Sequence, residues 1–382
     1  MTEIEIGMGK DGRRGYSLDE IAVLPSRRTR AADDVELGWQ IDAYSFDIPV
    51  IGSDSDGVTS PATAVELSRL GGVGALHVEG LWTRYEDPTP QLERIAAAAE
   101  QGGGDDVALL RELYDRPVDP DLIGRRVEEI RDAGGTACVS VSPAHTESLL
   151  EHVIAAEPDL LLIHGTVTSA EHIGSDGHEP LDLKQLVRRL EVPVIVGGCA
   201  SYQAAIHLMR TGAAGILVGV ASGASSTTAQ VLGVGNPLAT AIADARAARM
   251  RHLDETGVYV HVIADGGMST GGDIAKAVVC GADAVMMAAP LAAATEAPAR
   301  GALWSMGAFH RTLPRGRLRR VAPQGSLSEI LFGPADRPDG RTNLMGALRR
   351  SMAVSGYGTL KEFQKAEVVV TAPPSVRPGA QS

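Results

Sequence analysis

Short apolar runs alternate with amphipathic segments along most of this chain. The segments between the runs repeat apolar residues at helical spacing. Continuous apolar runs are typical of parallel strands that are buried on both faces, with helices packed outside them. Alternation of strand and helix between most of the eight runs predicts an α/β fold, a single (β/α)8 barrel. The eight runs are 48–53, 73–78, 137–141, 160–165, 193–198, 215–219, 259–266 and 284–288.

The segments outside the eight runs predict how the rest of the chain is organised. Residues 1–46 form an N-terminal arm that packs on the barrel, and residues 47–370 hold the barrel with its C-terminal extension. The connection between the second and third runs, 80–135, is long and has helical spacing, so we expect a helical excursion. Residues 371–382 are rich in Pro, Ser and Gly, and we expect a disordered tail there.

Composition and charge exclude several classes of function. The formal net charge is −13, so the surface repels nucleic acid and anionic lipid, and aromatic residues make up only 4% of the chain. No apolar run approaches a membrane span, and the first residues lack the apolar stretch of a signal peptide. Cys138, Cys199 and Cys280 occur singly, so neither a metal site nor a disulfide framework is expected. We expect a cytoplasmic protein that binds neither nucleic acid nor membranes.

The most informative local motif lies at the end of the seventh run. That run ends in Asp265-Gly266-Gly267, and a helix start follows at Ser269 or Thr270. Glycines let the backbone approach a ligand closely, and unpaired N–H groups at a helix N-terminus attract an anion. Asp265 is placed to accept hydrogen bonds from a ribose diol. The motif therefore indicates a nucleotide monophosphate site, after the strand where barrels of this class often hold phosphate.

A basic segment stands out in this acidic chain. Residues 310–320 read HRTLPRGRLRR. Such a run is either a solvated loop or a flap that contacts an anion, and the charge pattern alone leaves both interpretations open.

Several segments together resemble the IMP dehydrogenase/GMP reductase superfamily. The block 262–287, VIADGGMSTGGDIAKAVVCGADAVMM, is the most specific of them. The family's regulatory CBS module between strands two and three is absent. The overall pattern is similar to the actinobacterial IMP-dehydrogenase-related subfamily. The other matching segments are 16–25, 49–59, 71–77, 291–298 and 346–352.

The resemblance implies a catalytic loop after the sixth strand, and this chain departs from it at the main position. The family uses a cysteine thiolate that attacks C2 of the purine while hydride passes to or from nicotinamide. In the matching loop, 218–237, the cysteine position is Ser226. A serine hydroxyl needs an adjacent general base, whereas a thiol is partly ionised at neutral pH. Thr228 matches the threonine that helps to activate water or ammonia, and Glu296 matches its acidic partner.

The resemblance also implies nucleotide contacts at several loops of the barrel. Ser53 and Ser55 lie near the end of the first strand. Ala288 and Ala289 replace the family's Gly-Ser phosphate contact after the eighth strand. Met306 and Gly307 are what remains of the loop that contacts the base.

Other polar and sulfur-containing residues in the strands are interpreted as parts of the core. The family's aspartate that contacts the nicotinamide ribose falls at about His164 or Gly165. Cys199 could replace the missing nucleophile, but a buried small hydrophobe is the simpler interpretation. His77, His164 and His261 lie in strands and are expected to be structural, so no chemistry is assigned to them.

Three functions stay open from the sequence. The first is an NAD-dependent oxidoreductase of the IMP dehydrogenase-related type, which converts IMP to XMP in guanine nucleotide metabolism. The second is a GMP reductase, which converts GMP and NADPH to IMP and ammonia. The third is a catalytically silent paralogue that binds IMP, GMP or XMP and acts as a regulator or scaffold. The resemblance implies NAD or NADP if the protein is active, and a homotetramer or octamer. A paralogous dehydrogenase is a further candidate partner. The potassium ion that the dehydrogenases often hold is in doubt, because its loop is altered here.

Overall fold

The computed structural model describes residues 4–102, 106–171 and 182–371, and within them eight parallel strands close into a barrel. Seven of the eight strands fall within the predicted apolar runs, and β10 extends one residue beyond its run, to Cys199, so the predicted (β/α)8 fold is confirmed. Neighbouring strands pair in chain order, and the last strand pairs with the first. The strands are β6 (Val50–Gly52), β7 (Val73–His77), β8 (Cys138–Val141), β9 (Leu160–His164), β10 (Val194–Cys199), β11 (Gly215–Val218), β12 (His261–Asp265) and β13 (Ala284–Met287).

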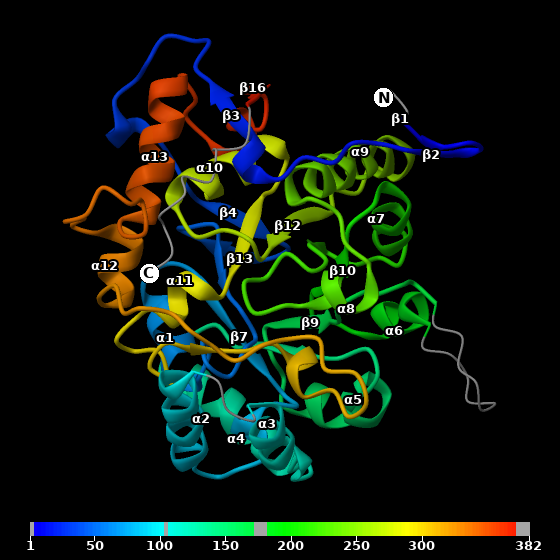
Figure 1. The fold of residues 1–382 in the computed structure, drawn as a ribbon, viewed down its shortest axis with the longest axis vertical. Helices are drawn as coiled ribbons and strands as arrows, with labels where there is room; N and C mark the ends of the chain where they lie inside the picture. The colour runs from blue at the N-terminus through cyan, green and yellow to red at the C-terminus, as the bar shows by residue number, and fades with distance from the viewer. Residues whose placement is uncertain (1–3, 103–105, 172–181, 372–382) are drawn as a thin grey trace.

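Helices surround the barrel and bury their apolar faces against it (Figure 1). Local sequence sets where several of them begin, because a Ser or Thr side chain accepts a hydrogen bond from an amide of the first turn. Ser60, Ser201 and Thr270 cap their helices in this way. The outer helices are α1 (Pro61–Arg69), α4 (Pro120–Asp132), α5 (Thr146–Ala155), α6 (Leu183–Arg189), α7 (Tyr202–Met209), α9 (Leu238–Thr256), α10 (Gly271–Cys280) and α13 (Leu344–Ser355).

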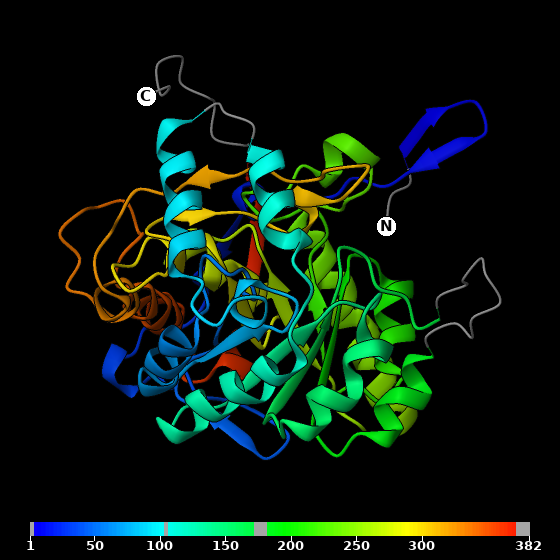
Figure 2. The same cartoon turned by 90° about the horizontal axis from the view of Figure 1, so that it is seen from below.

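The long connection after β7 forms a helical layer over the C-terminal end of the barrel. It contains η3 (Leu81–Thr83), α2 (Thr89–Gln101) and α3 (Asp106–Asp115) before α4 returns to the barrel wall. In Figure 2, α2 and α3 stand beside a two-stranded ribbon of β14 (Ala302–Leu303) and β15 (Arg319–Arg320). A second apolar core, which includes Leu92, Leu110 and Trp304, joins these elements.

The N-terminal arm packs on the opposite end and on the C-terminal extension. The hairpin of β4 (Trp39–Ile41) and β5 (Tyr44–Phe46) buries Trp39 and Ile41 beneath the barrel. The strand β3 (Ile21–Leu24) pairs antiparallel with β16 (Glu367–Val370), so the two ends of the chain are joined. A hairpin of β1 (Ile4–Gly7) and β2 (Lys10–Gly12) projects from the body of the protein in both Figure 1 and Figure 2.

The remaining short elements connect these layers. Among the described residues, no helix is both long and apolar enough to cross a membrane. The tail expected at 371–382 lies outside the described residues, apart from Thr371. The short elements are η1 (Leu18–Glu20), η2 (Ala32–Asp34), α8 (Thr228–Leu232), α11 (Ala289–Ala292), η4 (Met306–Phe309), α12 (Leu327–Phe332) and α14 (Leu360–Phe363).

Candidate functional site

The turn after β12 has the backbone that its two glycines allow. Gly266 and Gly267 have φ angles of 73° and 71°, in the left-handed region that disfavours side chains. A Cβ on Gly266 would lie 2.9 Å from the amide nitrogen of Gly223, and the Ser222 hydroxyl donates to the Asp265 carbonyl at 2.6 Å. The turn therefore packs directly on the loop that follows β11, which is the loop that carries Ser226.

The N-terminus of α10 is less open to an anion than the sequence suggested. The N–H groups of Ser269 and Thr270 both donate to the Asp273 carboxylate at 3.1 Å. The N–H of Gly271 donates to the Gly340 carbonyl, also at 3.1 Å. The expectation of unpaired N–H groups is therefore wrong for these three residues, because an acidic residue in the first turn and a neighbouring loop already bond to them.

Ser226 and Thr228 bond to each other. The Ser226 hydroxyl donates to Thr228 Oγ1 at 3.1 Å and accepts the Thr228 N–H at 3.3 Å, at the start of α8. Thr228 is buried and Ser226 is half-buried. Within the described residues, neither a histidine nor a carboxylate hydrogen-bonds to Ser226. The hydroxyl thus has no general base beside it in this conformation.

Glu296 has partners other than Thr228. Its carboxylate accepts the N–H of Leu327 at 3.0 Å and the hydroxyl of Thr295 at 2.9 Å. Leu327 begins α12, so Glu296 stabilises the start of that helix. The structure brings Ser226 and Thr228 together, but none of the hydrogen bonds of Glu296 goes to Thr228.

The basic segment 310–320 lies across the Ser226 loop. The N–H of Arg317 donates to the Ser225 carbonyl at 2.8 Å, and the N–H of Thr227 donates to the Arg315 carbonyl at 3.2 Å. Between these two bonds, Ser226 and Gly316 form an antiparallel bridge. The segment therefore packs on the loop that carries Ser226, and its contact with an anion stays a prediction.

His164 lies between two carboxylates that come from other strand ends. Its Nδ1 lies 2.9 Å from Asp54, and its Nε2 lies 3.4 Å from Asp265, at the C-terminal mouth of the barrel. The Ser140 hydroxyl also donates to Asp54, at 2.6 Å. Burial disfavours charge on His164, but Asp54 and Asp265 outweigh it and hold its pKa well above the usual value.

The sequence analysis did not single out Asp54, which the structure places beside His164. Burial alone would raise its pKa, but the neighbouring His164 outweighs burial, so the pKa is lowered and the carboxylate stays ionised. Its position after the first strand, between Ser53 and Ser55, was the available signal. A buried aspartate requires a partner, and that partner is 110 residues away.

Hydrogen bonds within the protein involve Ser53, Ser55 and Gly307, three of the nine predicted nucleotide contacts. The Ser55 hydroxyl donates to the Trp304 carbonyl at 2.9 Å, and the Ser53 N–H donates to the Met287 carbonyl at 2.9 Å. Gly307, which with Met306 lies in η4, accepts the N–H of Arg315 at 2.7 Å. These bonds hold the first strand end and the η4 segment in place around the mouth.

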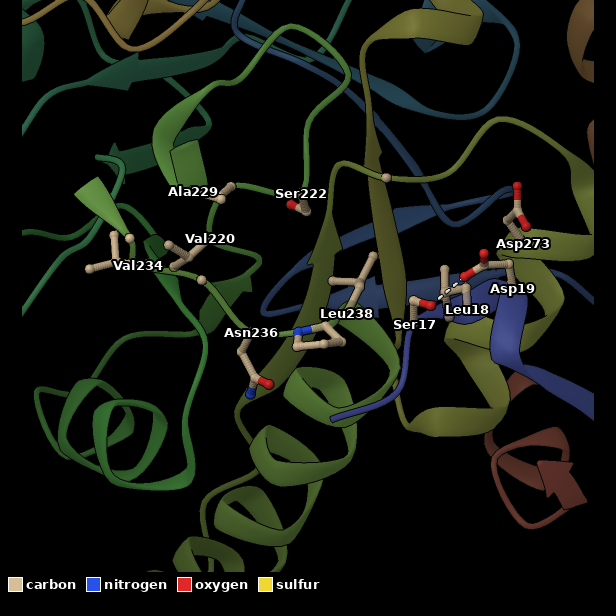
Figure 3. A pocket seen from close by; sticks show the side chains of 15 residues that line it. Ser17, Leu18, Asp19, Val220, Ser222, Ala229, Val234, Asn236, Leu238 and Asp273 are labelled. Atoms are coloured by element: carbon tan, nitrogen blue, oxygen red, sulfur yellow. Dashed lines mark hydrogen bonds between the residues drawn. The ribbon is translucent and has the colours of Figure 1, made fainter. Parts of the chain in front are cut away.

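Two cavities flank the Ser226 loop. The larger, of about 630 Å³, lies between the N-terminal arm and the loop, and its lining includes Asp19, Ser222 and Asp273 (Figure 3). The smaller, of about 220 Å³, is lined by Ala289, by three arginines and by small residues. Among the predicted contacts, Gly267 lines the larger cavity and Ala289 the smaller. Ser53, Ser55, Ser226, Thr228, Asp265, Gly266, Ala288, Glu296, Met306 and Gly307 lie outside both linings.

The three thiols do not replace the missing nucleophile. Burial raises the pKa of Cys199 to about 12 and that of Cys280 to about 12, and it also raises the pKa of Cys138. A thiol with such a pKa is not ionised near neutral pH. Cys199 is therefore a buried apolar residue, as expected. His261 packs edge-on against Trp39 and Tyr259, which also fits a structural role.

Comparison with known proteins defines the class of this barrel. Residues 15–316 match the model of the IMP dehydrogenase / GMP reductase domain. An "uncharacterized oxidoreductase" of Mycolicibacterium smegmatis is 50% identical over 373 residues, which cover 96% of this chain and 99% of that protein. The inosine-5'-monophosphate dehydrogenase of Escherichia coli K12 is 33% identical, with 94% of this chain and 93% of the enzyme covered.

A solved structure agrees with these sequence matches. It is an IMP dehydrogenase/GMP reductase-like protein from Corynebacterium glutamicum, with a TM-score of 0.90, 44% identity, and coverage of 97% of this chain and 98% of that one. The chain belongs to the IMP dehydrogenase/GMP reductase family of oxidoreductases. The alignment with the Escherichia coli enzyme spans 476 positions, more than the 382 residues here, so that enzyme has residues with no counterpart in this chain.

Proposed function

We propose that this chain binds a purine nucleoside monophosphate at the C-terminal mouth of the barrel, as a nicotinamide-dependent oxidoreductase of the IMP-to-XMP type. The observation that carries the proposal is the contact between two loops. The Asp265-Gly266-Gly267 turn packs on the loop that holds Ser226 and Thr228. Asp265 offers a carboxylate to a ribose diol, and the Ser226 loop is next to it. Family membership and the likeness to an inosine-5'-monophosphate dehydrogenase support the reaction type.

The reaction itself limits what the side chains must do. IMP, water and NAD⁺ give XMP, NADH and a proton, so a new C2–O bond forms as hydride leaves C2. Ser226 replaces the thiolate, and no general base is beside it to remove the proton of its hydroxyl for an attack on C2. Thr228 Oγ1, held by Ser226, is a group that can orient water. We therefore expect slow turnover in the wild type.

Residues at the mouth would hold a nicotinamide cofactor, which would accept the hydride when bound. Ser140 and His164 both bond to Oδ2 of Asp54. Within the described residues, Oδ1 of Asp54 receives no hydrogen bond, so it fits the role of acceptor for a ribose hydroxyl. Asp54 and His164 would then hold the cofactor at the strand end where the resemblance implies the nicotinamide ribose.

A second candidate is a catalytically silent nucleotide-binding protein that acts as a regulator or scaffold. It is favoured by the hydroxyl at Ser226, which lacks a base, and by the un-ionised state of the buried thiols. From the sequence, the GMP reductase direction was favoured by the lack of the regulatory module and by the Thr228–Glu296 pair. Because Glu296 bonds to Leu327 and Thr295 instead, the geometry does not favour that direction.

Titration of the purified protein distinguishes these functions. IMP, GMP and XMP are added separately in a calorimeter, and NADH or NADPH absorbance is followed in matched samples. Binding of IMP with formation of NADH supports the oxidoreductase, and consumption of NADPH with GMP supports the reductase. Binding without any absorbance change supports the silent paralogue. If none of the three nucleotides binds, the role given to Asp265 is wrong.

A further inference from the structure

Three arginines line the smaller cavity beside the Ser226 loop. Arg319 and Arg320 come from β15, and Arg341 comes from the loop before α13. The lining contains no aspartate or glutamate, although the chain has 48 of them and a net charge of −13. The cavity is therefore a positively charged site in an acidic protein.

Two of the three positive charges lack a carboxylate partner. Arg320 pairs with Glu100 at 3.1 Å. The Arg319 guanidinium donates to the Ala224 carbonyl at 2.9 Å, and no ion pair within the described residues neutralises it. The Arg341 side chain has no hydrogen-bond partner among the described residues. Each guanidinium has five N–H donors in a planar fork, so several donors stay free for a ligand.

The size and surroundings of the cavity restrict the ligand. At about 220 Å³ it has room for roughly seven water molecules, which is below the roughly 300 Å³ at which pockets for whole drug-sized ligands begin. A phosphate group with a few attached atoms fits this volume. The larger cavity, with Asp19 and Asp273 in its lining, would repel an anion.

The position of the cavity connects it with the proposed nucleotide site. Its lining includes Ser269, four residues after Asp265, and Ala289, just after β13. Both belong to loops at the mouth of the barrel. The cavity therefore begins four residues after Asp265. A ribose held by Asp265 and a phosphate in the cavity would be next to each other at the mouth.

We propose that the cavity among Arg319, Arg320 and Arg341 binds a phosphate monoester, and that this is the phosphate of the nucleotide at the mouth. The second part rests on the proposed function, whereas the first part does not. Guanidinium groups suit this task because they bind phosphate oxygens through two parallel charge-assisted hydrogen bonds. They would replace the contacts that Ser269, Thr270 and Gly271 cannot make while their N–H groups are bonded within the protein.

Calorimetry with three probes tests the proposal. Inorganic phosphate, IMP and inosine, which lacks the phosphate, are titrated into the wild type, Arg341→Gln and Arg311→Gln. Arg311 lies in the basic segment 310–320 with Arg319 and Arg320, is exposed like Arg341, and does not line the cavity, so it is the control. We expect Arg341→Gln to weaken the binding of phosphate and of IMP by about tenfold or more and to leave the binding of inosine unchanged. Arg311→Gln should behave like the wild type, and Arg341→Lys should lie in between, because it keeps the charge but not the fork.

The outcomes separate the two parts of the proposal. If phosphate binding falls in Arg341→Gln while IMP binding does not, the cavity serves a different phosphorylated ligand, and its assignment to the nucleotide is wrong. If the wild type binds phosphate but no nucleotide, the proposed function fails while the arginine site stands. The assignment of the arginine site is wrong if the wild type does not bind phosphate. It is also wrong if Arg341→Gln and Arg311→Gln weaken phosphate binding equally. Thermal unfolding of each variant checks that its fold is intact.

Discussion

His164 Nε2 lies 3.4 Å from the carboxylate of Asp265, the residue proposed to bind the ribose. The other ring nitrogen is held by Asp54. If Asp265 binds the ribose as proposed, the ribose diol and the imidazolium of His164 would share one carboxylate at the mouth of the barrel. This arrangement couples the charge of His164 to the stability of the protein and to ligand binding at the site.

The stability contributed by His164 should depend on pH. Its pKa is raised well above the usual 6.5, so its ion pairs stabilise the folded state fully below that value, and this contribution is lost as pH rises through the folded-state pKa. Thermal unfolding of the wild type and His164→Gln should differ most near pH 6 and converge at alkaline pH. The exposed His207 on α7 provides the control variant, His207→Gln. A difference that stays constant across this range would contradict a charged His164.

Restoring the thiol should restore chemistry if the rest of the site is intact. Ser226→Cys places a nucleophile that is partly ionised near neutral pH at the position now held by a hydroxyl. We expect NADH formation with IMP to be well above the slow or absent wild-type rate. The control is Ser225→Cys, one residue away and buried. Tight nucleotide binding by Ser226→Cys without turnover would show that more than the nucleophile has been lost.

The two glycines of the turn should tolerate substitution much less than a glycine nearby. Gly266→Ala puts a side chain at a φ of 73° and within 2.9 Å of the Gly223 amide nitrogen. It should lower the free energy of unfolding by about 1–2 kcal/mol or more. Gly272→Ala is the matched control, because it lies in α10 with its nearest neighbour 3.7 Å away. That change should be neutral or stabilise by about 0.5–1 kcal/mol. Chemical denaturation measures both, and equal effects would contradict the strained turn.

A buried hydrogen-bond chain should attach the helical layer to the mouth. The Tyr114 hydroxyl on α3 donates to Asp56 and accepts the indole N–H of Trp304 at 2.9 Å. Tyr114→Phe removes both bonds and leaves buried partners unsatisfied, so we expect a loss of about 1–3 kcal/mol in the free energy of unfolding. The control is Tyr85→Phe, whose hydroxyl donates to the Leu113 carbonyl from a partly buried position. If Tyr114→Phe costs no more than Tyr85→Phe, the chain is not a principal attachment.

Buried parallel strands can be recognised in a single sequence as apolar runs. Both faces of each barrel strand are covered, so its residues must be apolar, and the eight runs could be recognised one by one. The Asp265-Gly266-Gly267 turn was also readable, because only glycine adopts its backbone angles easily. The match of the loop 218–237 to the family pattern identified Ser226 as the position of the cysteine. The structure shows which groups form hydrogen bonds with Ser226.

Other features depend on contacts that form only when the barrel closes, and no local sequence pattern predicts those contacts. Asp54 and His164 meet only because β6 and β9 belong to one closed barrel, and a polar residue at a strand end looks the same with or without a partner. The capping of the α10 N-terminus by Asp273 and Gly340 was hidden for a similar reason, since part of it comes from a distant loop.

The sequence by itself determined the barrel, its strands and the identity of the residue at the nucleophile position, because these follow from local periodicity, local backbone geometry and a register along the chain. Only the tertiary structure decided that the basic segment lies over Ser226, that Glu296 bonds to α12, and that Arg319, Arg320 and Arg341 share a cavity. Such contacts join residues far apart in sequence. Their energies depend on distance and burial in three dimensions, and neither quantity is present in the order of the residues.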